Sequence, residues 1–277
     1  MKVWFITGAS SGFGDALAKA VLAQGDCVAA TFRKREQAEA FSTLHVARAF
    51  GVTMDVTDLA GVDEGIHAAA ERFGGIDILV NNAGYALRGP IEQIGDDEAR
   101  LQLDTNVMGI LRTIRAVLPL MRAKGAGRII NISSTAGTIG FPTLGLYSAS
   151  KAAVIGITES LAQEVVGMGI YVTSVEPGGF RTKFGGSSMI TPDSPVPSAY
   201  EGLTQSMDKV MAGFAETAPG DPALAAARLI ELAEADEPPL RLALGDDALP
   251  MIKGALARRL ADYDAHAEMG QGTSSPT

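Results

Sequence analysis

Short apolar runs rich in β-branched residues alternate with longer, alanine-rich stretches along most of the chain. Seven runs have the length of buried strands: Lys2–Thr7, Cys27–Phe32, Ala47–Met54, Ile76–Asn81, Arg128–Ile132, Ile170–Glu176 and Leu240–Leu244. Six stretches between or after them have helical character: Phe13–Gln24, Leu59–Phe73, Asp97–Arg122, Tyr147–Val166, Pro222–Ala235 and Asp246–His266. This alternation predicts an α/β fold in a single domain, a doubly wound, parallel, seven-stranded, Rossmann-like sheet with helices on both faces.

The composition limits the class of protein. The chain has 277 residues, of which 47% are apolar, which is enough to bury one sizeable core. Its 23 basic and 32 acidic residues give a formal net charge of −9, which argues against binding nucleic acid by neutralising phosphates. The single cysteine, Cys27, excludes an intrachain disulfide. The three histidines lack metal-ligand spacing, so we expect no metal.

No apolar run approaches the roughly eighteen residues of a membrane span, and the run from Val3 to Ile6 is too short for an export signal. We therefore expect a cytoplasmic protein that does not bind membranes. We assign residues 1–268 to the domain and about 184–215 to a substrate-loop insertion, because residues 185–200 contain three prolines. The small polar residues near the C-terminus predict a flexible tail at 269–277.

A glycine-rich turn joins the first predicted strand to the first predicted helix. It contains Gly8, Ser10, Ser11, Gly12, Phe13 and Gly14. Glycines here let the backbone turn and let a pyrophosphate approach the amides at the helix N-terminus. A tight turn with close helix packing is the alternative interpretation of such a cluster, and the strand–turn–helix context favours phosphate binding.

Tyr147 and Lys151 are four residues apart in a predicted helix, so their side chains share one face. A phenol ionises near pH ~10 and needs a partner to act as an acid or base at neutral pH. A neighbouring ammonium stabilises the phenolate and can also bond a nucleotide ribose. Taken alone, the pair also fits a solvated helix face.

Further motifs follow in a fixed order: Asp55-Val56, Asn81-Asn82-Ala83-Gly84, Asn106-Val107-Met108-Gly109, Ser133-Ser134 and Pro177-Gly178-Gly179-Phe180-Arg181-Thr182. With the glycine spacing and the Tyr–Lys pair, the series resembles the short-chain dehydrogenase/reductase family over about residues 1 to 185, with thinner support to about 245. The resemblance implies an enzyme that transfers hydride between a nicotinamide cofactor and a ketone or secondary alcohol. The opening segment and the segment Phe32–Arg35 look most like relatives that act on apolar ketones.

The resemblance implies four catalytic residues. Tyr147 exchanges the proton, Lys151 lowers its pKa, and Ser134, thirteen residues before the tyrosine, fixes the substrate oxygen. Asn106 holds a water of the proton relay. Ser134 as a strand-end cap, and Asn106 as a buried amide that bonds a kinked backbone, are the alternatives that the residues themselves allow.

The resemblance also implies a set of cofactor-binding residues beyond the glycine turn: Arg33, Asp55, Val56, Asn81, Ala83, Gly84, Tyr147, Lys151, Pro177, Gly178, Phe180 and Thr182. Asp55 alternatively caps the helix that begins near Asp58, and the amides at 81 and 82 can also satisfy the sheet. The segment from Pro177 alternatively forms an ordinary proline–glycine turn.

The end of the second predicted strand indicates which nucleotide binds. An acid there marks a free ribose 2′-hydroxyl, whereas a basic residue suits a 2′-phosphate. Here neutral Phe32 is followed by Arg33, Lys34 and Arg35, so we predict NADP(H) rather than NAD(H), with Arg33 as the phosphate partner. A solvated basic turn is the alternative. Ser11 departs from the second basic residue that many NADP-preferring relatives carry before Gly12.

We expect a small-molecule carbonyl or alcohol substrate, with its pocket lined from Phe141, Leu144, Phe180, Phe184, Met189 and Tyr200. The resemblance implies a homodimer or homotetramer assembled through the helices at 97–122 and 147–166, whose small residues alternatively face the sheet. An inactive nucleotide-binding sensor or scaffold of the same fold is the alternative function, although such proteins usually lose the tyrosine or lysine. An epimerase or dehydratase of the extended branch would have a longer chain and other glycine spacing.

Overall fold

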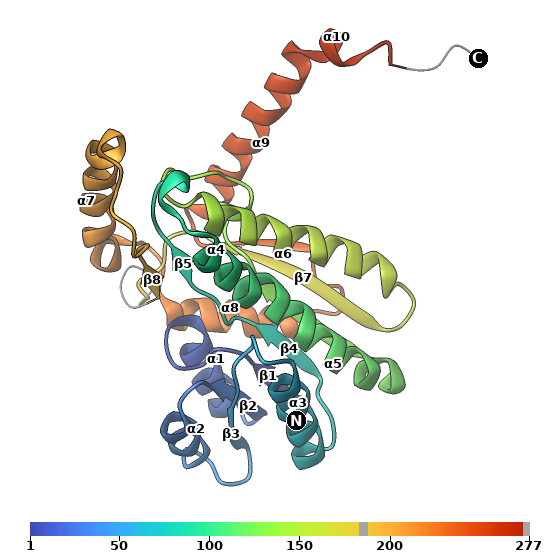
Figure 1. Ribbon diagram of the computed structural model, residues 1–277. Coiled ribbons are helices and arrows are strands. Elements are labelled where there is room, and N and C mark those ends of the chain that lie inside the picture. The colour runs from blue at the N-terminus through green and yellow to red at the C-terminus, as the bar shows by residue number, and fades with distance from the viewer. Residues whose placement is uncertain (183–187, 274–277) are drawn as a thin grey trace.

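The computed structural model describes residues 1–182 and 188–273, and it confirms the predicted single α/β domain. Seven parallel strands form one sheet in the order β3-β2-β1-β4-β6-β7-β9 (Figure 1). Their bounds are β1 Val3–Ile6, β2 Cys27–Phe32, β3 Ala49–Thr53, β4 Ile78–Asn81, β6 Gly127–Ile132, β7 Ile170–Pro177 and β9 Arg241–Leu244.

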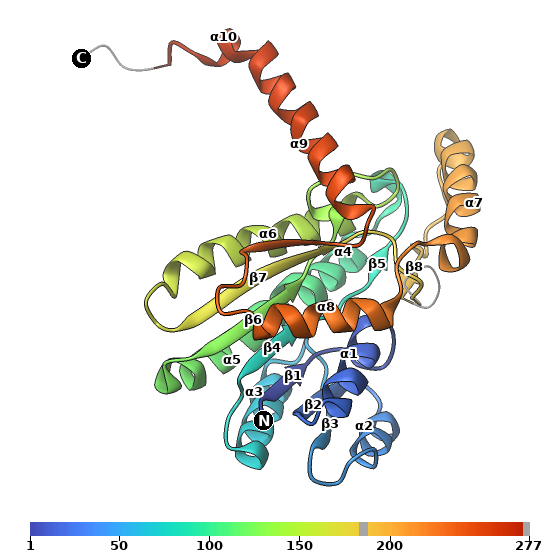
Figure 2. The ribbon, with the colours of Figure 1, turned by 180° about the vertical axis from the view of Figure 1, so that it is seen from behind.

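Helices cover both faces of this sheet (Figures 1 and 2). One face packs on α1 Gly12–Ala23, α2 Arg35–Ser42 and α8 Pro222–Glu234, and the other on α3 Leu59–Phe73, α5 Gly109–Lys124 and α6 Gly145–Glu164. Successive strand side chains alternate between the two cores: Trp4 and Ile6 belong to the first, and Phe5 belongs to the second. Both cores are largely apolar, which fixes the register of the central strands.

The order in which the chain adds strands to the sheet reverses between β1 and β4, which are neighbours. The strands β2 and β3 follow on one side of this pair, and β6, β7 and β9 follow on the other. In open α/β sheets, ligands bind at such a reversal, outside the carboxyl ends of the strands. The glycine turn after β1 and the Asn-Ala-Gly segment after β4 lie on this edge. The fold therefore brings the predicted motifs to one place.

The predicted helix at 97–122 is divided into three parts. α4 Asp96–Leu103 is followed by a π-helical turn, η2 Asp104–Met108, and then by α5. Arg112 of α5 donates to the Asp104 carbonyl and forms a 2.6 Å ion pair with the Asp104 carboxylate, which secures the turn from inside the next helix. The predicted helix is therefore present over its whole length, and only its centre departs from α-helical hydrogen bonding.

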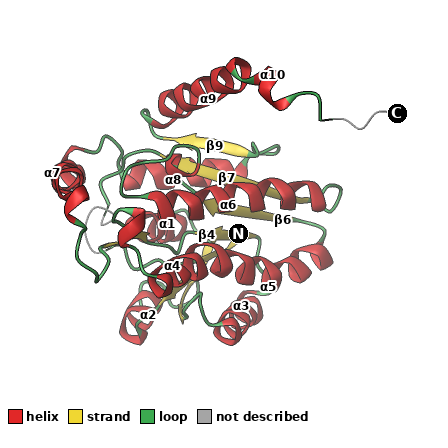
Figure 3. Cartoon of the chain, turned by 45° about the horizontal axis from the view of Figure 1, so that its top comes forward, coloured by secondary structure: helices red, strands yellow, loops and turns green. Residues whose placement is uncertain are grey.

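Three α-helices of the described residues were not predicted: α2, the short α10 Ala267–Gly270, and α7 Glu201–Thr217, which stands to one side of the body (Figure 3). The proline-rich segment before α7 contains β8 Met189–Ile190 and the 3₁₀ turn η5 Ser198–Tyr200, and β8 pairs in parallel with β5 Ala86–Leu87. The remaining elements are η1 Ile91–Gln93, η3 Thr135–Gly137 and α9 Ala248–Ala265. α9 begins shortly after the edge strand β9 and extends away from the body (Figure 1), and the predicted tail begins within α10.

Within residues 1–182 and 188–273, every helix falls short of the length and apolar character needed to cross a bilayer. The same residues include no group of three or more His, Cys, Asp or Glu side chains placed to hold a metal ion.

Candidate active site

A cavity of about 960 Å³ lies along the carboxyl ends of the strands. Of the predicted site residues, the following line it: Gly8, Ser10, Ser11, Gly12, Phe13, Arg33, Asp55, Val56, Ala83, Gly84, Ser134, Tyr147, Lys151, Pro177, Gly178, Phe180 and Thr182. Gly14, Asn81 and Asn106 lie outside its wall. The cavity thus collects residues from almost every motif that the sequence marked.

Backbone conformation and close contacts in the glycine turn require residues without a side chain. Gly8 and Gly12 have positive φ angles of 69° and 61°, and a Cβ on Gly8 would lie 2.8 Å from the Cα of Ala83. The Asn82 amide donates to the carbonyls of Thr7 and Gly8 at 2.9 and 3.0 Å and ties the turn to the end of β4. Asn82 therefore satisfies exposed backbone groups, as the sequence analysis expected of these amides, and it also lines the cavity, although only Asn81 of the two was assigned to the cofactor site.

Gly14 acts inside the turn rather than on the cavity wall. A Cβ there would lie 2.5 Å from the Gly8 carbonyl oxygen and 2.6 Å from the Asn82 amide nitrogen. The first turn of α1 carries no side-chain cap at Ser11, so its backbone N–H groups remain open to an anion.

Asn81 lies away from the cavity, contrary to the prediction that it lines the cofactor site. It is buried, donates to Asn131 of β6 at 2.8 Å and accepts from Thr113 of α5 at 2.6 Å. Asn131 in turn donates to Thr158 of α6. β4 ends at Asn81, which bonds the helix layer, whereas Asn82 and Ala83 follow the strand and reach the cavity edge.

Asp55 lies on the cavity wall, and its carboxylate accepts from the backbone N–H and the hydroxyl of Thr57 at 2.9 and 2.8 Å. Asp58, not Asp55, caps α3, because its side chain accepts from the Ala60 N–H at 3.1 Å. The alternative role of Asp55 as the helix cap is therefore excluded.

Tyr147 and Lys151 lie one turn apart in the first half of α6, and both side chains are buried. The Lys151 Nζ lies 5.7 Å from the centre of the Tyr147 ring and donates to the Ile132 carbonyl at 2.8 Å. Ser134 makes a side-chain hydrogen bond with the Tyr147 phenol. The predicted serine, tyrosine and lysine therefore meet at one point of the cavity.

Burial raises the pKa of Tyr147 to about 12, and the hydrogen bond from Ser134 opposes this rise. Burial also lowers the pKa of Lys151 to about 8. The net direction for Tyr147 is opposite to the predicted lowering, because its removal from water outweighs its polar contacts. At neutral pH the structure therefore presents a protonated phenol beside an ammonium that titrates within reach of physiological pH.

Asn106 lies in the π-helical turn and is fully buried. Its side chain accepts from the Tyr85 N–H at 3.1 Å and donates to the Tyr85 carbonyl at 2.9 Å and the Ser150 hydroxyl at 3.0 Å. A Cβ on Gly84 would lie 3.0 Å from the Asn106 Oδ1 and 3.7 Å from the Lys151 Nζ, so the amide and the ammonium flank the same glycine. Both roles weighed for Asn106 remain open: it bonds an irregular backbone and lies near the lysine.

The turn after β7 is fixed by a carboxylate from far along the chain. The Gly179 N–H donates to Asp247 at 2.8 Å, just before α9, and a Cβ on Gly178 would lie 2.2 Å from that carboxylate. Phe180 stacks edge-on against Phe13 of the glycine turn, with ring centres 4.9 Å apart. The sequence carries no spacing signal for Asp247, because its contact depends on the pairing of β7 with β9.

The predicted substrate residues divide three ways. Phe141, Leu144, Phe180 and Met189 line the cavity, Tyr200 does not, and Phe184 lies outside the described residues. The cavity has further apolar lining that sequence reasoning missed: Leu101, Ile190, Met207, Val210, Met211, Phe214 and Met251. Four of these seven come from the unpredicted helix α7.

Comparison with known proteins agrees with this geometry. Residues 2–191 match the family described as short chain dehydrogenase. The oxidoreductase BOA17 of Botryotinia fuckeliana is 40% identical over 249 residues, which are 90% of each chain. A short-chain dehydrogenase structure from Streptomyces avermitilis has a TM-score of 0.89 at 39% identity and covers 99% of this chain and 100% of its own. A closed form of serine dehydrogenase complexed with NADP⁺ has a TM-score of 0.75 at 27% identity and covers 87% and 94%.

The chain therefore belongs to the short-chain dehydrogenase/reductase family. It is an oxidoreductase of the kind that acts on CH–OH and C=O groups with a nicotinamide dinucleotide. The resemblance inferred from the motifs is confirmed.

Proposed function

We propose that this protein uses NADP(H) to interconvert ketones and secondary alcohols of apolar small molecules. The observation that carries the proposal is the meeting of Ser134, Tyr147 and Lys151 on the wall of the cavity that the glycine turn also borders. The apolar half of the cavity, with its methionines and phenylalanines, supports a substrate that lacks charge.

The residues present fit a dinucleotide. The glycine turn keeps side chains away from the uncapped N-terminus of α1, where backbone N–H groups would hold a diphosphate. Asp55, Val56, Ala83 and Gly84 would hold the adenosine half, whereas the turn from Pro177 to Thr182 would hold the nicotinamide half. When bound, NADP(H) supplies or accepts the hydride.

The remaining chemistry is proton transfer by the chain itself. In reduction, Tyr147 gives its phenolic proton to the substrate oxygen, and Ser134 donates a hydrogen bond that fixes this oxygen. The positive charge of Lys151 stabilises the phenolate left behind, and in oxidation the same steps run in reverse. The protonated state of Tyr147 near neutral pH suits the reductive direction.

Arg33 supports the choice of NADP(H). It follows neutral Phe32 at the end of β2, is exposed and lines the cavity together with Lys34 and Gln37. A guanidinium at this point suits a 2′-phosphate, and no acid stands there to repel it.

Loss of NADPH absorbance with a panel of ketones of increasing apolar size tests the proposal. We expect turnover with NADPH and a KM for NADH at least about tenfold higher than for NADPH. Arg33→Ala should raise the KM for NADPH about tenfold and leave that for NADH unchanged, because only the phosphate contact is lost. Arg35→Ala is the matched control, since Arg35 lies outside the cavity wall. A tenfold preference for NADH would overturn the cofactor assignment.

A further inference from the structure

The position of the Ser134 hydroxyl depends on a short turn. Ser134 precedes η3, its side chain accepts from the Ala136 N–H at 3.1 Å, and Thr138 closes the turn with a bond from its N–H to the Thr135 carbonyl at 3.0 Å. Gly137 packs directly on α6, where a Cβ would lie 2.8 Å from the Lys151 carbonyl oxygen. Contacts that fix Thr138 therefore also fix the short turn that places Ser134 beside Tyr147.

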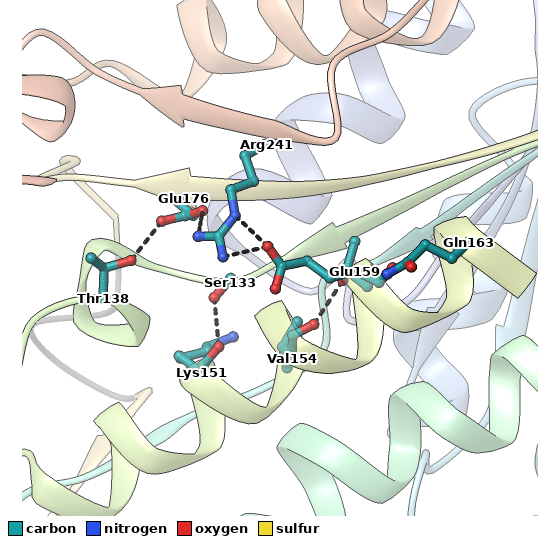
Figure 4. A network of polar contacts seen from close by, with 9 residues as sticks. Ser133, Thr138, Lys151, Val154, Glu159, Gln163, Glu176 and Arg241 are labelled. Atoms are coloured by element: carbon teal, nitrogen blue, oxygen red, sulfur yellow. Dashed lines mark hydrogen bonds and ion pairs between the residues drawn. The ribbon is translucent and has the colours of Figure 1, made fainter. Parts of the chain in front are cut away.

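Thr138 forms hydrogen bonds with residues of two other elements. Its hydroxyl donates to the carboxylate of Glu176 on β7 at 3.0 Å, and its carbonyl accepts from Arg259 on α9 at 2.7 Å (Figure 4 shows the first contact). Both partners lie far from Thr138 in the sequence. Tertiary contacts thus fix the end of the turn.

Glu176 is a buried acid, with only 2% of its surface exposed. Arg241 of β9 pairs with it at 3.3 Å, and the same guanidinium pairs with Glu159 of α6 at 2.6 Å, as Figure 4 shows. A buried carboxylate is costly unless it is paired and hydrogen-bonded, and apolar replacements of such groups are often at least as stable. Stability alone therefore does not account for an acid at this position.

We propose that Glu176 is a positioning residue for Ser134: its carboxylate accepts the Thr138 hydroxyl and so fixes the turn that presents the Ser134 hydroxyl to Tyr147. This inference rests on the proposed role of Ser134. It extends the site to a residue that touches neither the cavity nor the reacting atoms.

Four variants test it. Thr138→Val keeps the shape of the side chain and removes the hydroxyl, Glu176→Leu removes the acceptor, and Glu176→Gln keeps an acceptor. Glu159→Gln is the matched control, because it weakens the other partner of Arg241 and leaves Thr138 untouched. The measurements are kcat and KM with a ketone, the Kd for NADPH by fluorescence titration, and the melting temperature.

We expect Thr138→Val and Glu176→Leu each to lower kcat about tenfold, with the Kd for NADPH unchanged. A fifth variant that combines Thr138→Val with Glu176→Leu should be no worse than the poorer of these two single variants. Glu176→Gln should retain kcat within about threefold, as should Glu159→Gln. Should Glu176→Leu fail to fold, the comparison of Thr138→Val with Glu176→Gln decides. Full activity in Thr138→Val, or a loss in Glu176→Gln as large as in Thr138→Val, would overturn the proposal.

Ser134→Ala separates this inference from the function on which it rests. A large loss of turnover in Ser134→Ala with a fully active Thr138→Val would reject only the role of Glu176. Wild-type turnover in Ser134→Ala would reject the proposed function itself.

Discussion

Tyr147 and Lys151 share one buried pocket, and burial moves their pKa values in opposite directions, to about 12 and about 8. Each shift favours the uncharged form, because low-dielectric surroundings penalise charge on either group. Proton donation by Tyr147 creates a phenolate, so the reductive step needs the positive charge of Lys151. The state of the lysine, not that of the tyrosine, should then set the upper pH limit of reduction.

We therefore predict that kcat/KM for NADPH in ketone reduction is level below about pH 7 and falls as the pH rises through about 8. Below this value Lys151 is protonated, and above it the charge that stabilises the phenolate is lost. A Lys151→Arg variant keeps its charge, so its residual activity should show no decline near pH 8. A wild-type profile that stays level to pH 10 would contradict this account.

Single residues also show where sequence reasoning reaches its limit. The glycine turn and the Tyr147–Lys151 pair were predictable because turns and helix spacing are local features, whereas Ser134 was assigned from the resemblance to the family. The inward direction of Asn81 was not predictable, because it depends on Thr113 and Asn131, which the sheet and α5 bring to it. The roles of Asp247 and Glu176 were not predicted for the same reason, because their hydrogen-bond partners lie on other elements.

At the scale of elements, the strands were predicted well because a parallel sheet buried on both faces requires continuous apolar runs. The π-helical turn was not predictable from periodicity, because it depends on Asn106 bonding both polar backbone groups of Tyr85 and on Arg112 reaching the Asp104 carbonyl. The helix α7 was missed because the proline-rich segment before it led us to assign about 184–215 to a loop, although its apolar residues Met207, Val210, Met211 and Phe214 recur at helical spacing. These irregular elements border the cavity, and functional sites are where structure most often departs from what local sequence patterns predict.

Two helices share an exposed face that carries small and apolar residues. Ala152, Gly156 and Ser160 of α6 are exposed and do not face the sheet, and a Cβ on Gly156 would meet nothing within 4 Å. Leu101 and Leu103 of α4 are exposed apolar residues as well. We propose that copies of the chain pair through this region, since small residues permit close helix packing.

Sedimentation velocity at micromolar concentration measures this directly, and we expect a dimer or tetramer. Gly156→Glu and Ala152→Glu should shift the population toward monomer, because each places a bulky charge on the proposed contact face. Ser206→Glu, on α7, is an exposed control away from that face. A wild-type chain that sediments as a monomer would contradict the proposed assembly.

The account of the whole enzyme depends on the Tyr147 phenol as the group that exchanges the proton. Tyr147→Phe removes one oxygen and leaves the buried ring in place, and Tyr263→Phe, on the exposed side of α9, is the matched control. The decisive measurement is ketone turnover alongside NADPH affinity. We predict that Tyr147→Phe loses at least about a hundredfold in kcat while its Kd for NADPH stays within about threefold. Wild-type turnover in this variant would contradict the mechanism.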